Sequence, residues 1–201
     1  RTDLYEETAI YYSTEQNSLW INYSGGTMDY TDFSAIYGDD PEAETISQAI
    51  SGADEATVRE ALLTYGIDLP ENAEFQEMEG QAGGYTFTVS QQREGDRLYD
   101  GTLTCTLYED GKLGDISNNI ITCEKYKDFP VISEEAAWEQ IREGYFQVYL
   151  EEGRQIRELT TGPVTMKYMT DSKGYYQPVY AFTTSIDGQE DCEIYIPAVE
   201  Q

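Results

Sequence analysis

Close pairs of carboxylates are the residues of this chain whose type and spacing could do chemistry. Two acidic groups at the right separation can hydrolyse a glycosidic bond without any histidine. Glu134-Glu135, Glu151-Glu152 and Asp39-Asp40 are such pairs. Because 39 of the 201 residues are Asp or Glu, adjacent carboxylates also arise from composition alone, and most of them should be solvated. An acid-pair hydrolase of the glycosidase type therefore remains an alternative, and no catalytic residue is assigned.

The charge balance and the lack of histidine exclude several further classes of function. The 39 acidic residues outnumber the 12 Lys and Arg, which leaves a net charge of −27. Such a chain is repelled by a phosphate backbone and by an anionic membrane surface, so we expect no nucleic-acid partner. Without histidine there is no Ser-His-Asp or Cys-His nucleophile and no His-ligated zinc.

Two acidic loops are candidate calcium sites. The segment 187–191 (Asp-Gly-Gln-Glu-Asp) is one, and Asp29 with Asp32 is the other. Neither has the spacing of an EF-hand loop, and Asp-Gly between two strands is first of all a turn signal. The Gly83-Gly84 pair precedes a strand and not a helix, so it is no phosphate cradle. We therefore predict no metal and no cofactor.

Tyr175 and Tyr176 are the candidate partner-binding residues. They lie in the run Gly-Tyr-Tyr-Gln-Pro at 174–178, and tyrosine is enriched at protein interfaces. The alternative interpretation is the start of a strand, with one tyrosine packed inward and the other at the rim.

The elements that must position these residues begin with strands. Tyr, Ile and Trp dominate the first 38 residues, for which we predict no helix and a meander of three strands at 4–13, 18–24 and 27–33. Next, Asp40-Pro41 predicts the start of a helix that runs to about Ser51, and Asp54 can cap a second helix that stops at Gly66. Three strands should follow, at 85–90, 98–108 and 116–126.

A similar order then repeats. Ser133 is predicted to cap a helix that runs to about Gly144 and buries one face, made of Ala137, Trp138, Ile141 and Tyr145. Strands are expected at 164–169, 176–186 and 192–197. The predicted fold class is α+β, with antiparallel sheets and helices packed on one face. Its parts are an N-terminal β-meander (1–40) and two helix-plus-three-strand units (41–129 and 130–201).

The chain contains three cysteines: Cys105, Cys123 and Cys192. Each lies in an apolar strand register, which is typical of buried free cysteine, and a single disulfide is the alternative. If Asp110-Gly111 closes a two-residue hairpin, position 105 lies opposite 116 and position 123 opposite 98. Cys105 and Cys123 would then be too far apart to bridge.

A family resemblance rests on the last 70 or so residues. The stretch 130–144 (PVISEEAAWEQIREG) resembles the start of the C-terminal module of the YycI and YycH regulatory proteins of Gram-positive bacteria. The segments 164–168 (VTMKY), 176–182 (YQPVYAF) and 194–198 (IYIPA) resemble the strands of that module. The helix-plus-three-strand order is also similar to the PepSY domain.

The resemblance implies a non-enzymatic, extracytoplasmic regulatory domain. Relatives of this kind are anchored by an N-terminal membrane helix or lipid, which here would precede Arg1, and they act on a membrane protein such as a sensor histidine kinase. A peptidase-inhibiting pro-domain is the alternative that PepSY-like relatives suggest. The matching residues are expected to be scaffold: Ala137, Trp138 and Ile141 inside the helix, Pro178 at a strand entry, and Tyr180 and Phe182 in the core.

Overall fold

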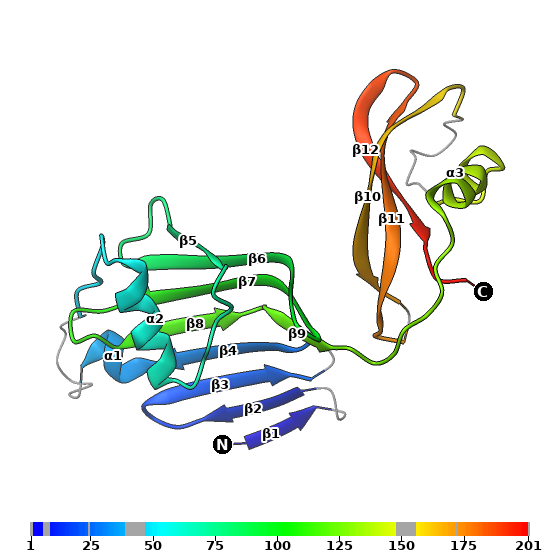
Figure 1. Cartoon of the computed structure of the whole chain (residues 1–201). Coiled ribbons are helices and arrows are strands. Elements are labelled where there is room, and N and C mark those ends of the chain that lie inside the picture. The colour runs from blue at the N-terminus through cyan, green and yellow to red at the C-terminus, as the bar shows by residue number, and fades with distance from the viewer. Residues whose placement is uncertain are drawn as a thin grey trace. The chain divides into compact units, whose positions relative to one another are not determined.

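The computed structural model describes residues 2–5, 9–23, 25–38, 47–147, 156–171 and 173–200. The chain divides into two compact units, Arg1–Lys125 and Tyr126–Gln201, called unit 1 and unit 2 below. Every strand pair among the described residues is antiparallel. A helix packs against the strands of each unit (Figure 1). The α+β class with antiparallel sheets is therefore confirmed in its coarse form.

Unit 1 is built on one large sheet. Its strands are β1 (Thr2–Tyr5), β2 (Ala9–Ser13), β3 (Asn17–Asn22), β4 (Thr27–Asp32), β5 (Glu74–Glu77), β6 (Gly84–Glu94), β7 (Arg97–Leu107), β8 (Leu113–Asn118) and β9 (Ile121–Glu124). They are ordered β1-β2-β3-β4-β8-β7-β6-β5 in space, with β9 paired to β7. The five strands after α2 (Glu55–Thr64) thus share a sheet with the N-terminal strands, and two separate helix-plus-three-strand units are not confirmed.

The N-terminal meander has one strand more than predicted. Residues 4–13 include parts of both β1 and β2, which pair with each other in a register that places Asp3 opposite Tyr11. The prediction of no helix in this region was also wrong, because α1 (Phe33–Tyr37) follows β4 directly. The Asp32 carboxylate caps α1 by accepting hydrogen bonds from the main-chain N–H of Ser34 and Ala35.

The helix expected to end near Ser51 is not present where the structure can be followed. Residues 39–46, with the predicted start at Asp40-Pro41, lie outside the described residues, and 47–51 contain no helix. Ala49 forms a bridge with Tyr108, and the N–H of Ile50 donates to the carbonyl of Leu107 over 2.9 Å. Tyr85 donates its hydroxyl to the Ile50 carbonyl at 2.6 Å. Pairing with the sheet therefore outweighs the local helical signal in this stretch.

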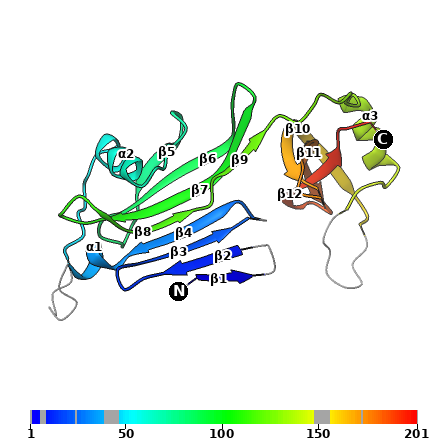
Figure 2. The same cartoon turned by 90° about the horizontal axis from the view of Figure 1, so that it is seen from below.

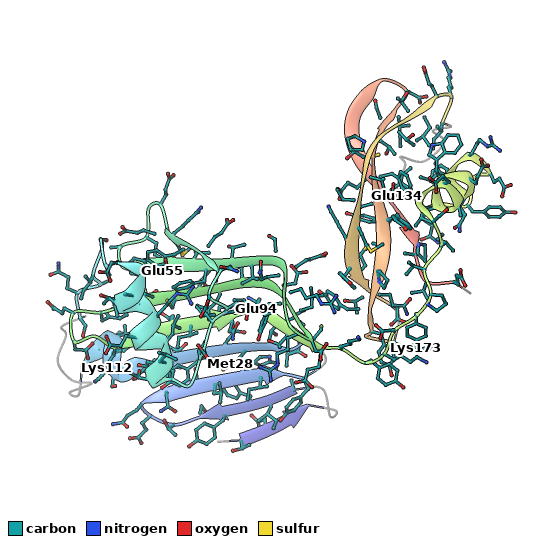
Figure 3. The ribbon with its side chains drawn as sticks, in the orientation of Figure 1. Met28, Glu55, Glu94, Lys112, Glu134 and Lys173 are labelled. Carbon is teal, nitrogen blue, oxygen red and sulfur yellow. The ribbon has the colours of Figure 1, made fainter. Side chains whose placement is uncertain are left out.

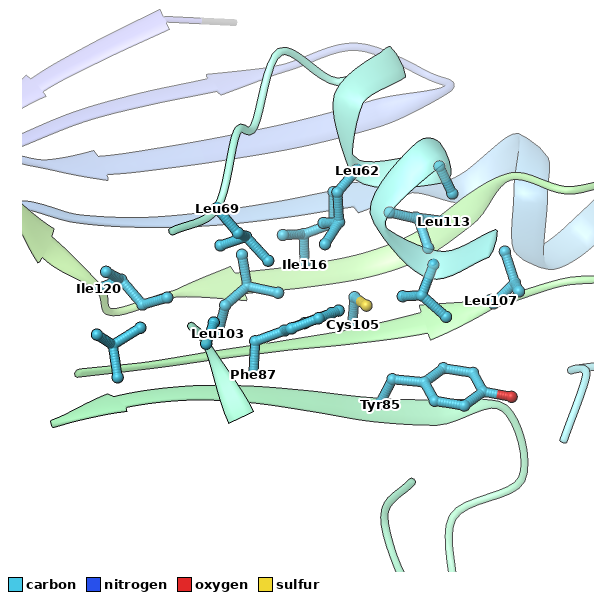
Figure 4. Packing of buried hydrophobic residues seen from close by; sticks show 14 residues of the cluster. Leu62, Leu69, Tyr85, Phe87, Leu103, Cys105, Leu107, Leu113, Ile116 and Ile120 are labelled. Atoms are coloured by element: carbon cyan, nitrogen blue, oxygen red, sulfur yellow. The ribbon is translucent and has the colours of Figure 1, made fainter. Parts of the chain in front are cut away.

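Helix α2 supplies the cover for the core of unit 1. Asp54 caps it as predicted, accepting from the N–H of Thr57 at 2.9 Å. Val58, Ala61 and Leu62 are buried on the face that meets the sheet. Opposite them, alternate residues of β6, β7 and β8 point to the same side, as the close-up in Figure 4 shows for Phe87, Leu103, Cys105 and Ile116. Burial of each large side chain contributes about 2 kcal/mol to folding.

The predicted third strand of this unit is in fact two strands. Residues 116–126 separate into β8, which lies between β4 and β7, and β9, which pairs with the first residues of β7. Gly101 lies where β7 changes partner, with φ at +129°, and a Cβ there would be 2.1 Å from the carbonyl oxygen of Asn119. The change of partner therefore needs glycine at position 101.

Unit 2 is smaller and has its own core. Helix α3 (Glu134–Arg142) is followed by β10 (Leu159–Thr170), β11 (Tyr176–Ile186) and β12 (Gln189–Pro197), which form a three-stranded sheet in that order. Ser133 caps α3 as predicted. Ala137 and Ile141 pack with Tyr180, Phe182, Ile194 and Ile196. Side chains project from both faces of this sheet in Figure 3, although α3 covers only one of them.

Two residues of the predicted helix face are not buried. Trp138 and Tyr145 are exposed, while Ala137 and Ile141 have almost no accessible surface. The indole N–H of Trp138 reaches sideways to the hydroxyl of Thr161 in β10, at 3.2 Å. A helix of this length on a three-stranded sheet buries only a narrow stripe, and Trp138 lies at the edge of that stripe.

All three cysteines are free thiols. Their predicted strand partners are present, but the two-residue hairpin is not: the N–H of Tyr108 donates to the carbonyl of Lys112, which leaves three residues in the turn, and a bulge after Thr106 restores the register. Cys105 lies opposite Ile116, and Cys123 lies opposite Leu98. Cys105 is buried in the core of unit 1, whereas Cys123 and Cys192 are half-buried. Burial raises the pKa of the Cys105 thiol to about 12.

A Gly101→Ala substitution should destabilise unit 1 by about 3 kcal/mol, because the new Cβ would clash with the Asn119 carbonyl and the φ angle is strained. The matched control is Gly80→Ala. Gly80 also has a positive φ, at +78°, but has open space around it, so its cost should be about 1 kcal/mol. Urea denaturation measures both variants, and equal losses would contradict the role given to Gly101.

Cys105 should be the last thiol to be alkylated. The thiolate is the reactive form, and burial both raises the pKa of Cys105 and blocks the reagent. We expect iodoacetamide at pH 8 to label Cys123 and Cys192 in the folded protein, and Cys105 only after the protein has been unfolded in urea. Peptide mass mapping against time gives the order, and early labelling of Cys105 in the folded protein would contradict its placement.

Candidate functional site: an exposed aromatic patch on unit 2

Four exposed side chains gather at one end of unit 2. Tyr126, Lys127 and Phe129 come from the segment that leads into this unit, and Tyr175 comes from the turn between β10 and β11. We call these four residues the aromatic patch. The side chains of Tyr126, Phe129 and Tyr175 are 74%, 48% and 51% exposed. Other large rings of this chain are also exposed, such as Tyr23 and Tyr145, but a group of exposed rings in contact is a candidate interaction surface.

The patch residues contact one another. The ring centroids of Tyr126 and Tyr175 are 5.7 Å apart, with the rings inclined at 34°. The Lys127 ammonium lies 4.3 Å from the centroid of Phe129 and 5.7 Å from that of Tyr126, so it faces two rings at once. Such a cation–π contact contributes about 0.5–1 kcal/mol at an exposed site. The four side chains thus form one surface, although the sequence separates Tyr175 from the other three.

The turn that carries Tyr175 is held by one carboxylate. Asp171 accepts hydrogen bonds at Oδ1 from the main-chain N–H of Lys173, at 2.8 Å, and of Tyr175, at 2.9 Å. Its Oδ2 accepts from the side-chain amide of Gln177 at 2.6 Å. The hydrogen bond from Tyr175, followed by those from Lys173 and Gln177, lowers the pKa of Asp171 below its ordinary value. Lys173 is labelled in Figure 3, where it marks this turn.

The segment on the other side of the patch is held by main-chain hydrogen bonds. Val131 forms a bridge with Val199, and the N–H of Ile132 donates to the carbonyl of Ala198 at 2.8 Å. The N–H of Glu200 donates to the carbonyl of Pro130 at 3.1 Å. Phe129 therefore immediately precedes a stretch whose main chain is hydrogen-bonded to residues 198–200.

The two tyrosines predicted for partner binding are placed differently. Tyr175 is in the turn and is exposed, whereas Tyr176 begins β11 opposite Thr170 and is half-buried. Sequence reasoning missed Tyr126, Lys127 and Phe129. The signal is the run of cations and aromatic rings at 125–129 (Lys-Tyr-Lys-Asp-Phe), which includes the end of the strand predicted at 116–126.

Three carboxylates of the two loops considered for calcium serve the fold. Asp29 accepts from the Ser117 hydroxyl at 2.6 Å, while Asp32 caps α1. Asp187 accepts at Oδ1 from the N–H groups of Arg157 and Glu158, both at 2.9 Å. Among the described residues no group of three or more metal-ligating side chains converges.

Comparison with known proteins gives no further identification. No protein-family model matches the chain, and no characterised protein or solved structure matches it significantly. In the part of the chain that the structure describes, no helix is both long enough and apolar enough to span a membrane.

Asp171→Ala should loosen the turn that presents Tyr175, because three donors lose their acceptor. We expect faster amide hydrogen exchange at Tyr175 and Lys173, with the core amides of unit 2 unchanged. Asp171→Asn keeps one acceptor oxygen. Its exchange rates at Tyr175 and Lys173 should therefore lie between those of the wild type and the alanine variant.

The same contact predicts the pH dependence. A carboxylate with a lowered pKa stabilises the turn above its unfolded pKa, and this stabilisation is lost as the pH falls through the lower, folded value. The Tyr175 amide should therefore stay protected at neutral pH and lose protection only in strong acid. Loss of protection near pH 6 would assign the effect to a different group.

Proposed function

We propose that this protein is a non-enzymatic binding domain that acts outside the cytoplasm. In this proposal the chain is anchored at the membrane by a segment preceding Arg1, and it regulates a membrane protein, of which a sensor histidine kinase is the best example. The observation that carries the proposal is the aromatic patch, with three exposed rings and one cation held in contact. Aromatic residues dominate the binding energy of protein interfaces, which makes this surface the best candidate for the contact.

The order of elements in unit 2 supports the proposed resemblance to a known family of modules. One helix followed by three antiparallel strands is the order expected from the resemblance to the YycI, YycH and PepSY modules. Tyr180 and Phe182, which carry part of that resemblance, are core residues of unit 2. We therefore propose that unit 2 is a module of this kind and that unit 1 is a separate antiparallel sheet joined to it.

Four carboxylates of the chain are unsuited to act as the general acid of a hydrolase. A glycosidase needs a general acid whose pKa is raised. Where a described carboxylate has a clearly shifted pKa, as in Asp54, Glu135, Asp171 and Glu193, the shift is downward and hydrogen bonds cause it. These four groups remain ionised and hydrogen-bonded to the fold, which is the opposite of what proton donation requires.

Site-specific photocrosslinking in the native cell tests the proposal. A benzoylphenylalanine placed at position 175 of the full-length protein should crosslink to a membrane protein. The matched control is the same probe at position 145, where Tyr145 is also exposed and also in unit 2 but lies outside the aromatic patch. In the protein that carries the probe at position 175, Phe129→Ala should reduce the yield of the crosslinked product severalfold.

Two results would contradict the proposal. One is equal crosslinking from positions 175 and 145, because equal yields would indicate random collisions and not a specific interface. The other is the absence of any membrane-protein product at position 175, in a sample where the probe protein is correctly anchored.

A further inference from the structure

We infer that unit 1 binds a basic, amphipathic α-helix of a protein partner on an apolar face formed by β2 and β3. Ile10 and Tyr12 of β2 lie opposite Ile21 and Leu19 of β3, respectively, so all four point to the same side of the sheet. We call these four residues the β2–β3 face. This face belongs to unit 1 and the aromatic patch to unit 2, so the inference goes beyond the proposed function.

The register of the sheet places the β2–β3 face on the same side as the core of unit 1. Leu19 lies opposite Tyr30 of β4, and Ile21 lies opposite Met28. Met28 and Tyr30 pack against the core that α2 covers. Directly opposed residues of an antiparallel pair point to the same side of the sheet. The β2–β3 face is therefore a continuation of the core surface toward the β1 edge of the sheet.

Helix α2 covers this surface from β6 to β4 and no further. Just before the helix, the N–H of Ala53 donates to the hydroxyl of Tyr85 in β6 at 2.9 Å. Just after it, the Tyr65 ring lies 5.5 Å from the Tyr30 ring of β4. Figure 1 shows α2 lying across these strands. Ten helical residues span about 15 Å, which equals three intervals of about 4.8 Å between strands. Strands β3 and β2 lie beyond the end of this cover.

Side chains become more exposed where the cover by α2 ends. Phe87 and Leu103, which belong to the covered core, have accessible surfaces of 0%. On the β2–β3 face, by contrast, Tyr12 is 43% exposed and the other three side chains are half-buried. No described helix lies over β2 and β3 in Figure 1. A contiguous apolar surface that remains accessible in this way marks a site of protein interaction.

The dimensions of the β2–β3 face favour a helix as its occupant. The face is two strands wide, about 5 Å, and its paired residues are two positions apart along each strand, about 7 Å. An α-helix is about 10 Å across and buries one apolar stripe, so a single amphipathic helix covers a face of this size. A helix packed on the sheet is also the arrangement that α2 already gives to the rest of this core.

The charge of the surrounding strands selects a basic helix. Residues 2–38, which include β1 to β4, contain six Asp or Glu and no Lys or Arg. One of these acids, Glu15, is exposed in the turn that joins β2 to β3. Unit 1 as a whole has 25 acidic residues against 6 basic ones, a net charge of −19. Lys and Arg on the polar face of a partner helix are therefore attracted, whereas a second copy of this chain would bring the same acidic strands and be repelled.

Binding of a designed peptide to the whole chain tests the inference. The probe is a blocked, fluorescent peptide of leucine and lysine, about 18 residues long, whose leucines form one stripe when the peptide is helical. One control peptide has glutamate in place of lysine. The other has the same leucines and lysines in an order that forms no stripe. Fluorescence polarisation at physiological salt should show that the striped lysine peptide binds at least about tenfold more tightly than either control.

Two neighbouring residues of β3 provide matched variants. Leu19→Lys puts a cation into the β2–β3 face, whereas Ser18→Lys puts the same cation on the other face of the same strand. Leu19→Lys should weaken binding of the striped lysine peptide at least about tenfold, and Ser18→Lys less than about twofold. Tyr12→Ser keeps the test informative if Leu19→Lys does not fold, because Tyr12 is the most exposed residue of the face. It should weaken binding about fivefold.

The inference is overturned if the striped lysine peptide does not bind, or if Tyr12→Ser and Leu19→Lys both bind it as the wild type does. Equal binding of the peptide without a stripe would also overturn it, because charge alone would then explain the attraction. A dimer of the chain in sedimentation equilibrium that Tyr12→Ser abolishes would assign the face to a second copy and not to a basic helix. The crosslink from position 175 tests the aromatic patch separately, so either proposal can fail alone.

Discussion

The constraint on which the rest of this structure depends is the mutual repulsion of its carboxylates. With 39 Asp and Glu in the chain, folding must bury apolar residues while it leaves the negative charges in water. Among the described residues, the fully buried set is apolar apart from Thr106 and Thr184. Alternation along the strands achieves this in unit 1, where β6, β7 and β8 direct apolar side chains to α2 and threonine, serine and aspartate to the other face.

Unit 2 also buries apolar residues while it leaves its carboxylates in water, but with less helix. Helix α3 covers the face of Tyr180 and Phe182, whereas no described helix covers the opposite face, which still buries Val179 and Ala181. Lys167 on β10 and Glu193 on β12 are on that opposite face, on either side of the central strand. Because Ala181 is small, the two long side chains meet above β11 and cover it. The pair itself is worth about 0.5 kcal/mol at most, so its main effect is to shield apolar surface.

Local signals were sufficient for much of this fold. Asp54 and Ser133 cap the helices predicted for them, and β11 has the predicted bounds. Each of these depends on residues close in sequence. The pairs of Cys105 and Cys123 are the predicted ones, but a bulge after Thr106 sets the register of Cys105 and the two-residue turn does not form. The errors have non-local causes. Residues 47–51 read as helix but pair with the sheet, and the break between β8 and β9 depends on how β7 divides its two partners.

The candidate site shows the same limit more sharply. Tyr175 could be selected from the sequence because it stands in a turn rich in aromatic residues, but its neighbours could not. Tyr126 and Phe129 precede the helix by several residues, and nothing local shows that their segment ends beside the β10–β11 turn. Only the pairing of Val131 with Val199 and the long β10–β11 hairpin bring these parts together. Folding buries apolar side chains, so it does not explain why the rings of the aromatic patch are brought together and left exposed. Binding to a partner does explain an exposed group of rings.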